Sequence, residues 1–172
     1  MPKKIENVRE LLLEETKRQM LEKGYKDLNI RSVANACKLG TGTVYNYFKS
    51  KEMLVASVLL ADWNEHLREM SELACDDSQE LLGGIYESLR RFARDNQRLF
   101  SDLAAKQVAL SSAERHSVLR EQISAFVLPL CEKRGLNDPI FAADFISESL
   151  ICWSMSGMDF DRVYPILEKI VR

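Results

Sequence analysis

Residues 38–52, KLGTGTVYNYFKSKE, form a segment whose composition does not suit a helix that only fills a core. The stretch from about Thr41 to Tyr47 has the length of a short helix, yet Val44 and Phe48 are its only apolar anchors. Glycine costs about 1 kcal/mol in a helix interior, and threonine, valine, tyrosine and asparagine are indifferent helix formers. A requirement other than helix stability therefore determines these residues.

The two faces of this short helix differ in chemistry. At about 100° per residue, Val44 and Phe48 lie about 40° apart and are expected to face the preceding helices. The opposite face carries Gly42, Thr43, Asn46 and Tyr47. It is small at its N-terminal end and offers hydrogen-bonding groups behind, as a helix needs when that end enters a DNA major groove.

The preceding residues complete a helix-turn-helix. Asn29 is a good N-cap for a short helix from Ile30 to about Cys37, and residues 37–40 form the turn. Tyr45 and Tyr47 place phenolic groups where phosphates would line the groove. Lys51 lies beside the Ser50 N-cap of the next helix, where a positive charge and free backbone amides together suit a phosphate.

The charge distribution agrees with a polyanionic partner. Residues 1–51 carry eleven lysines and arginines against six acidic residues, whereas the rest of the chain carries thirteen against twenty. A basic head on an acidic body is expected when only one part faces nucleic acid, although a solvated charged surface remains an alternative by charge alone. For the motif itself, the alternative is an ordinary helical hairpin with a tyrosine-rich surface.

The segment from Leu12 to Leu54 resembles the DNA-binding domain of the tetracycline-repressor (TetR/AcrR) family of bacterial transcriptional regulators. The motifs that carry the resemblance are GY at 24–25, IRSVA at 30–34 and GTVYNYFKSKE at 42–52. The resemblance implies a dimer with an N-terminal three-helix DNA reader and a larger helical domain for ligand binding and dimerisation. It also implies base or near-base contacts by Arg31, Thr41, Gly42 and Thr43, phosphate contacts by Asn29, Tyr45, Tyr47 and Lys51, and either kind of contact by Asn46.

The chain departs from the family pattern at two places. Lys38 and Gly40 stand where the family usually has glycine and serine, so either Lys38 is left-handed or another residue takes the strain. Glu15 and Gln19 stand where the family usually has small or apolar residues. These two side chains either loosen the first helix or pair locally.

Helical periodicity dominates the whole chain, which predicts an all-α fold. We expect a helix-turn-helix domain over residues 1–50 and a helical ligand-binding and dimerisation domain over 51–172. The expected helices cover about 5–24, 30–37, 41–47, 51–74, 79–95, 113–134, 138–158 and 159–171, with Gly24 and Gly135 as stops and a kink at Pro129. Residues 97–110 form a further segment of unassigned structure.

Composition excludes several classes of protein. No start segment resembles a signal peptide and the longest apolar region, about residues 140–158, is too polar to span a membrane, so a cytoplasmic protein without a membrane partner is expected. The four cysteines are far apart in sequence and are expected to be buried thiols, with a redox sensor as the alternative. The two histidines lack partners at metal-ligand spacing, and no glycine-rich phosphate loop is present. We expect no enzyme, no catalytic or metal-binding residue and no cofactor.

The expected partners are a roughly palindromic operator in double-stranded DNA, a second copy of the chain and a small-molecule effector. The last two helices are apolar on more than one side, which favours a homodimer through them over burial within a monomer. A ligand pocket would be lined by Trp63, Met70, Tyr86, Phe92, Phe100, Phe126, Trp153 and Met155, residue types that are more often plain core. A helix-turn-helix dimer or helical adaptor without an effector is the alternative function.

Overall fold

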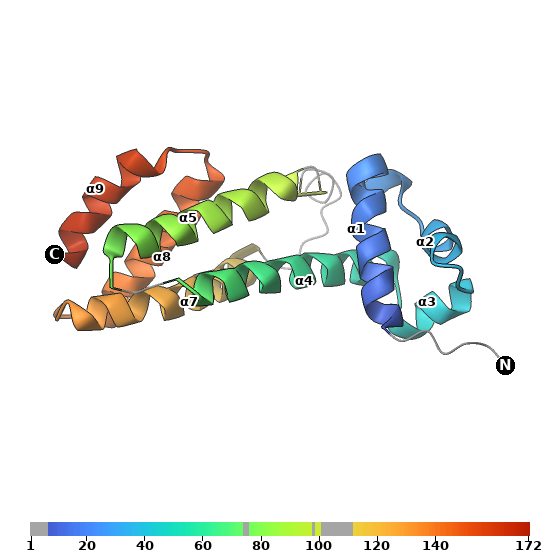
Figure 1. The fold of residues 1–172 in the computed structure, drawn as a ribbon, viewed down its shortest axis with the longest axis horizontal. Coiled ribbons are helices and arrows are strands. Elements are labelled where there is room, and N and C mark those ends of the chain that lie inside the picture. Colours follow the sequence, from blue (N-terminus) through green and yellow to red (C-terminus); the bar gives the residue numbers. More distant parts are fainter. Residues whose placement is uncertain (1–6, 74–75, 98, 101–111) are drawn as a thin grey trace. The chain divides into compact units, whose positions relative to one another are not determined.

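The computed structural model describes residues 7–73, 76–97, 99–100 and 112–172 (Figure 1). Across these residues it contains α-helices and no strand, which confirms the all-α prediction. The helices are α1 Val8–Asp27, α2 Ile30–Ala36, α3 Thr41–Tyr47, α4 Lys51–Ser71, α5 Ser78–Asp95, α7 Ser112–Lys133, α8 Pro139–Met155 and α9 Phe160–Val171. The predicted boundaries agree to within a few residues, whereas most of residues 97–110 lies outside the described ranges.

The chain divides into two compact units. The first contains the described residues up to Trp63 together with those from Asn96 to Phe100, and the second contains residues 64–95 and the described residues from 112 onward. Helix α4 therefore contributes to both units. Among the described helices, none combines the length and apolar character that crossing a membrane requires.

The first unit holds α1, α2 and α3 on a common apolar core. Leu12, Val33 and Val44 are fully buried there, one from each helix. Gly24 has φ +80° and interrupts α1 one turn before its end, as the sequence predicts. Because of this reversal Tyr25, only 2% exposed, turns into the core.

Polar side chains also fasten the first unit. Glu15 accepts hydrogen bonds from Arg18 and from Gln19, and the Gln19 carbonyl oxygen accepts one at 2.6 Å from the Ser32 hydroxyl of α2. Of the two alternatives predicted for Glu15 and Gln19, the structure therefore shows local pairing. The buried Asp62 of α4 pairs with Lys17 of α1 and accepts a hydrogen bond at 2.7 Å from Asn96.

The second unit is built around α5 and α8. Helix α8 packs against α5 and α7, and α9 packs against α5 and α8. Two adjacent glycines of α5 allow close approach. A Cβ atom on Gly83 would lie 3.1 Å from the ring of Phe160, and one on Gly84 would lie 2.7 Å from Leu73.

Three described helices, α2, α7 and α8, end in the same Schellman turn, in which a left-handed residue follows the C-cap. After α7 and α8 the left-handed residue is Gly135 and Gly157, with φ +67° and +76°. After α2 it is Lys38, with φ +56°. Lys38 is therefore left-handed, which is the first of the two alternatives that the sequence predicts for this turn. Left-handed backbone costs a residue with a Cβ atom on the order of 1–2 kcal/mol, which glycine avoids.

The described cysteines differ in their exposure to solvent. Cys37 and Cys131 are buried, and burial raises the pKa of both thiols, but Cys152 is exposed, so the expectation of buried thiols is wrong there. Its position on α8 places it on the face that the unit does not cover. Helix α7 includes Pro129, the residue predicted to kink it, and continues to Lys133.

Candidate nucleic-acid interface

The helix-turn-helix begins at Asn29, whose side-chain oxygen accepts a hydrogen bond at 2.8 Å from the backbone N–H of Ser32. This is the predicted N-cap of α2. The turn then runs through Lys38 to Gly40, the N-cap residue of α3, and the amide of Thr43 bonds the carbonyl oxygen of Gly40 at 2.9 Å. Asn29 therefore fixes the start of α2 with its oxygen.

Helix α3 divides into the two faces that the sequence predicts. Val44 is fully buried and Phe48, its C-cap residue, is 2% exposed. Tyr45 and Tyr47 are 46% and 47% exposed. The other predicted contact residues of α2 and α3 are exposed or half-buried: Arg31, Thr41, Gly42, Thr43 and Asn46. A continuous polar surface of α3 therefore faces away from the core.

Gly42 is not required by the packing of the protein itself. A Cβ atom there would meet no atom within 4 Å, and the residue has no positive φ. Gly83, by contrast, has the ring of Phe160 against it. Gly42 lies in the first turn of α3, where a glycine with open space above it lowers helix stability without improving any contact. The space is therefore suited to a partner whose surface comes close to the backbone of α3.

The side chain of Lys51, at the start of α4, contacts two groups at the end of α1. Its ammonium nitrogen lies 4.3 Å from the centroid of the Tyr25 ring and donates to the carbonyl oxygen of Lys26 at 3.5 Å. The Tyr25 hydroxyl donates to Glu52 at 3.1 Å. Hydrogen bonds from its own backbone N–H and from Ser50 lower the pKa of Glu52, and burial raises the pKa of Tyr25. Gly24 and Tyr25 thus support a cation at the edge of the helix-turn-helix.

Arg9 is a candidate that the sequence did not indicate. It is exposed in the first turn of α1, and its guanidinium carbon lies 5.7 Å from the centroid of the Phe48 ring. The Phe48 ring in turn lies 6.4 Å from that of Tyr47. Arg9 therefore adds a positive charge near the C-terminal end of α3. Only the crossing of α1 and α3 brings these residues together, so their spacing of 39 positions gives no signal.

Residues 12–58 match the family model described as bacterial regulatory proteins, tetR family. The matched segment covers α2, α3, most of α1 and the start of α4. Over residues 12–58 the chain is therefore similar to bacterial regulators of the tetR family.

Solved structures share the fold of this chain over almost its whole length. A transcriptional regulator from Rhodococcus sp. Rha1 is 19% identical, with a TM-score of 0.60 over 95% of this chain and 91% of that one. RolR without ligand is 20% identical, with a TM-score of 0.62 over 94% and 89%. The fatty acid degradation regulator FadR from Bacillus halodurans is 18% identical, with a TM-score of 0.56 over 98% and 96%. Comparison with curated protein sequences gives no significant match.

The predicted ligand-pocket residues are distributed over both units. Trp63 and Phe100 belong to the first unit. The second unit contains Met70 and Tyr86, both 1% exposed, the half-buried Phe92 and Phe126, and Trp153 and Met155, which are 44% and 54% exposed. The Tyr86 hydroxyl donates to the carbonyl oxygen of Met158 at 2.7 Å. Met70 and Tyr86 therefore serve the core, and the pocket itself stays a prediction.

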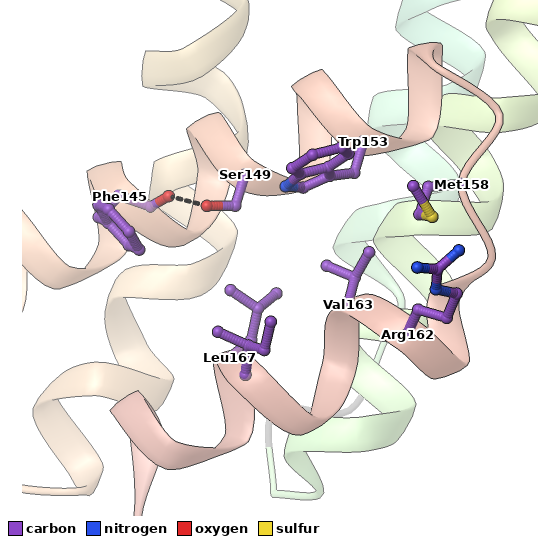
Figure 2. Close-up of a pocket in the computed structure, with 8 residues that line it drawn as sticks. Phe145, Ser149, Trp153, Met158, Arg162, Val163 and Leu167 are labelled. Carbon is purple, nitrogen blue, oxygen red and sulfur yellow. Dashed lines mark hydrogen bonds between the residues drawn. The ribbon is translucent and has the colours of Figure 1, made fainter.

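A groove of about 280 Å³ runs between α8 and α9 of the second unit (Figure 2). Its lining residues are Phe145, Ser149, Trp153, Met158, Arg162, Val163, Ile166 and Leu167. Trp153 is the one residue of the predicted pocket among them. Figure 2 shows the Ser149 hydroxyl turned back to the carbonyl oxygen of Phe145, to which it donates at 2.8 Å. The groove is therefore mainly apolar.

The same two helices expose large apolar side chains. On α8, Ile140 and Phe141 are 65% and 67% exposed and Phe145 is 50% exposed, and on α9 Ile166 is 64% exposed. Together with the groove, these side chains form one apolar surface of α8 and α9. Large exposed apolar surfaces of this kind usually mark sites of interaction with another molecule.

Within the described ranges, no cluster of three or more histidine, cysteine or acidic side chains could hold a metal ion. The histidines have other partners. The buried His66 bonds the Ser88 hydroxyl at 2.8 Å, and His116 bonds Glu148 at 2.7 Å. These contacts join neighbouring helices of the second unit.

Proposed function

We propose that this chain is a regulator of the tetR family that binds a roughly palindromic operator as a homodimer, with one α3 in each of two successive major grooves. The observation that carries the proposal is the exposed polar face of α3, with open space over Gly42 at its N-terminal end. Among the residues that the structure describes, none contacts the space over that glycine. A DNA major groove admits a helix at this depth and offers donors and acceptors to its side chains.

We assign the base contacts to the residues at the front of α3 and at the start of α2: Arg31, Thr41, Gly42 and Thr43. The phosphate contacts fall to Asn29, Tyr45, Tyr47 and Lys51, with Asn46 reaching either. Exposed tyrosines and a cation braced by Tyr25 support this division, because phosphate contacts position a protein whereas base contacts specify sequence.

The homodimer forms through the apolar surface of α8 and α9. Pairing these helices with their twofold mates gives a four-helix interface, and the groove between them receives side chains of the second copy. An isologous interface of this kind makes the operator palindromic, since each half-site meets the same protein surface. Recognition helices about 34–36 Å apart would then match one turn of DNA.

The second domain, expected over residues 51–172, binds a small-molecule effector that changes DNA affinity. In this proposal the protein is a repressor released by its ligand, acting in the cytoplasm where bacterial DNA lies. The alternative is a dimeric regulator or helical adaptor without an effector, which the complete burial of Met70 and Tyr86 favours. The effector would be found as a compound that weakens operator binding.

The test is selection of bound duplexes from random DNA by the whole protein at moderate salt. Enrichment of an inverted repeat with half-sites one helical turn apart is the expected result. If repeated rounds enrich no sequence, the chain does not work as a sequence-specific regulator.

A further inference from the structure

We propose that Lys38, in the turn between α2 and α3, contacts the DNA backbone and that the chain tolerates a strained lysine there for this reason. The inference rests on the proposed function. It adds a contact that neither the motif nor the predicted set of DNA-binding residues contains.

The backbone after α2 closes in a Schellman turn. The amide of Lys38 donates to the carbonyl oxygen of Asn35 at 3.0 Å, and the amide of Leu39 donates to that of Ala34 at 2.9 Å. These are the two hydrogen bonds of a Schellman turn, in which the left-handed position strongly prefers glycine. Lys38 occupies that position with φ +56°.

Two other Schellman turns of the described chain have glycine at the left-handed position. After α7, Gly135 and Leu136 donate to Glu132 and Cys131 at 3.0 and 3.3 Å, and after α8 the equivalent left-handed residue is Gly157. Both turns carry glycine in the position of Lys38. Asn7, the other described residue with a side chain and positive φ, is of a type that tolerates it.

Lys38 places a positive charge on the surface close in sequence to the start of α3. Lys38 is exposed and lies three residues before Thr41, so their Cα atoms are at most about 11 Å apart. In the proposed complex, where α3 enters a major groove, this distance is short enough for the lysine side chain to contact a phosphate beside that groove. Strain that persists in a functional segment is expected where the strained residue itself serves the function.

A competing explanation is local. A cation at the C-terminal end of α2 interacts favourably with the helix dipole, which would offset part of the strain without any DNA. The two explanations differ in what removal of the charge does to DNA binding. Only a backbone contact changes the salt dependence of that binding.

The experiment compares Lys38→Gly and Lys38→Gln with the wild type, using the duplex selected from random DNA and a scrambled duplex over a range of salt. Both variants are expected to lower the salt slope by about 0.9 and to lose on the order of eightfold in affinity at 0.1 M salt on both duplexes. Lys38→Gly should at the same time raise the Tm by a few degrees, because glycine removes the backbone strain.

Gly135→Lys is the matched control, because it places lysine in the same turn far along the chain from α3. It should lower the Tm and leave DNA binding unchanged. Unchanged affinity and salt slope in Lys38→Gln, with normal binding by the wild type, would overturn this inference alone. A wild type that binds both duplexes equally would overturn the proposed function, while loss of salt slope in Lys38→Gln would still support the phosphate contact.

Discussion

At the scale of single residues, the glycines of this chain differ in whether packing requires them. Gly83 and Gly84 have neighbouring side chains where a Cβ atom would lie, so packing explains them. Gly42 has open space, and neither packing nor backbone conformation requires it. A residue that lowers helix stability without an internal reason indicates an external partner.

Gly42→Ala should therefore separate stability from function. Alanine is expected to raise the free energy of unfolding by about 0.5–1 kcal/mol, because it favours the helix and meets no neighbour. The added methyl group should weaken binding to the selected duplex by about tenfold, since it occupies the space left for DNA. Thermal unfolding and fluorescence anisotropy measure the two effects.

Gly83→Ala serves as the control for Gly42→Ala. Its Cβ atom would lie 3.1 Å from Phe160, so no gain in stability is expected, and α5 is outside the DNA-reading surface. Unchanged DNA affinity in Gly42→Ala would mean that DNA does not approach α3 at this point.

At the scale of elements, α1 and α2 are fastened through a polar chain rather than by packing alone. Arg18 lowers the pKa of Glu15 to about 2, from a usual value of 4.5, by donating hydrogen bonds to its carboxylate. Gln19 links this carboxylate to Ser32 on α2. The orientation of the helix-turn-helix thus depends partly on a charged group.

This arrangement predicts a defined pH dependence. Because the folded-state pKa of Glu15 is lowered, its contribution to stability is complete above about pH 4.5 and is lost as the pH falls toward 2. Glu15→Gln should lower the Tm near pH 6. The difference in Tm from the wild type should shrink as the pH falls from about 4.5 toward 2. Glu14→Gln, at an exposed neighbour, is the control. A Tm difference that stays constant down to the lowest pH with cooperative unfolding would contradict the assignment.

The sequence predicted elements whose signals are local. The Asn29 cap, the Gly24 interruption and the span of α3 all follow from residues next to them in the chain. It could not predict contacts that depend on how helices cross, such as Arg9 on Phe48 or Lys51 on Tyr25. The conformation of Lys38 stayed open because composition alone does not say which residue of a turn takes the strain.

Burial in the second unit was harder to predict for a related reason. Apolar residues follow α8 on several sides, and periodicity does not say which side the unit itself covers. Packing against α5 and α7 buries Ile146 and Leu150 but leaves Phe141 and Cys152 exposed. The same uncovered side accounts for the wrong expectation at Cys152.

At the scale of the whole molecule, binding to a palindromic operator requires two copies of the chain. The exposed apolar surface of α8 and α9 is expected to be buried between them, which removes Ile140, Phe141, Phe145 and Ile166 from water. A monomer would leave these side chains solvated and would present a single α3. Sequence-specific regulation and dimerisation are therefore linked.

Ile166→Glu should convert the dimer to a monomer, because Ile166 is 64% exposed in the single chain and lines the groove between α8 and α9. A buried, unpaired carboxylate would oppose association. Val118→Glu changes an apolar residue on α7 that is 52% exposed, and it should leave the dimer intact. Light scattering at micromolar concentration gives the masses. A monomeric wild type, or a dimeric Ile166→Glu, would refute this interface.

We expect α3 of each copy to read base pairs, and this is tested by comparing the sequences that wild type and Thr43→Ala select from random DNA. Thr43→Ala should change the preference at two base pairs related by the symmetry of the site and retain the remaining positions. Tyr47→Phe, which removes a phosphate donor, should select the wild-type sequence with weaker affinity. If Thr43→Ala selects the same sequence as the wild type with the same ranking at every position, α3 does not read bases through Thr43 and the account is wrong.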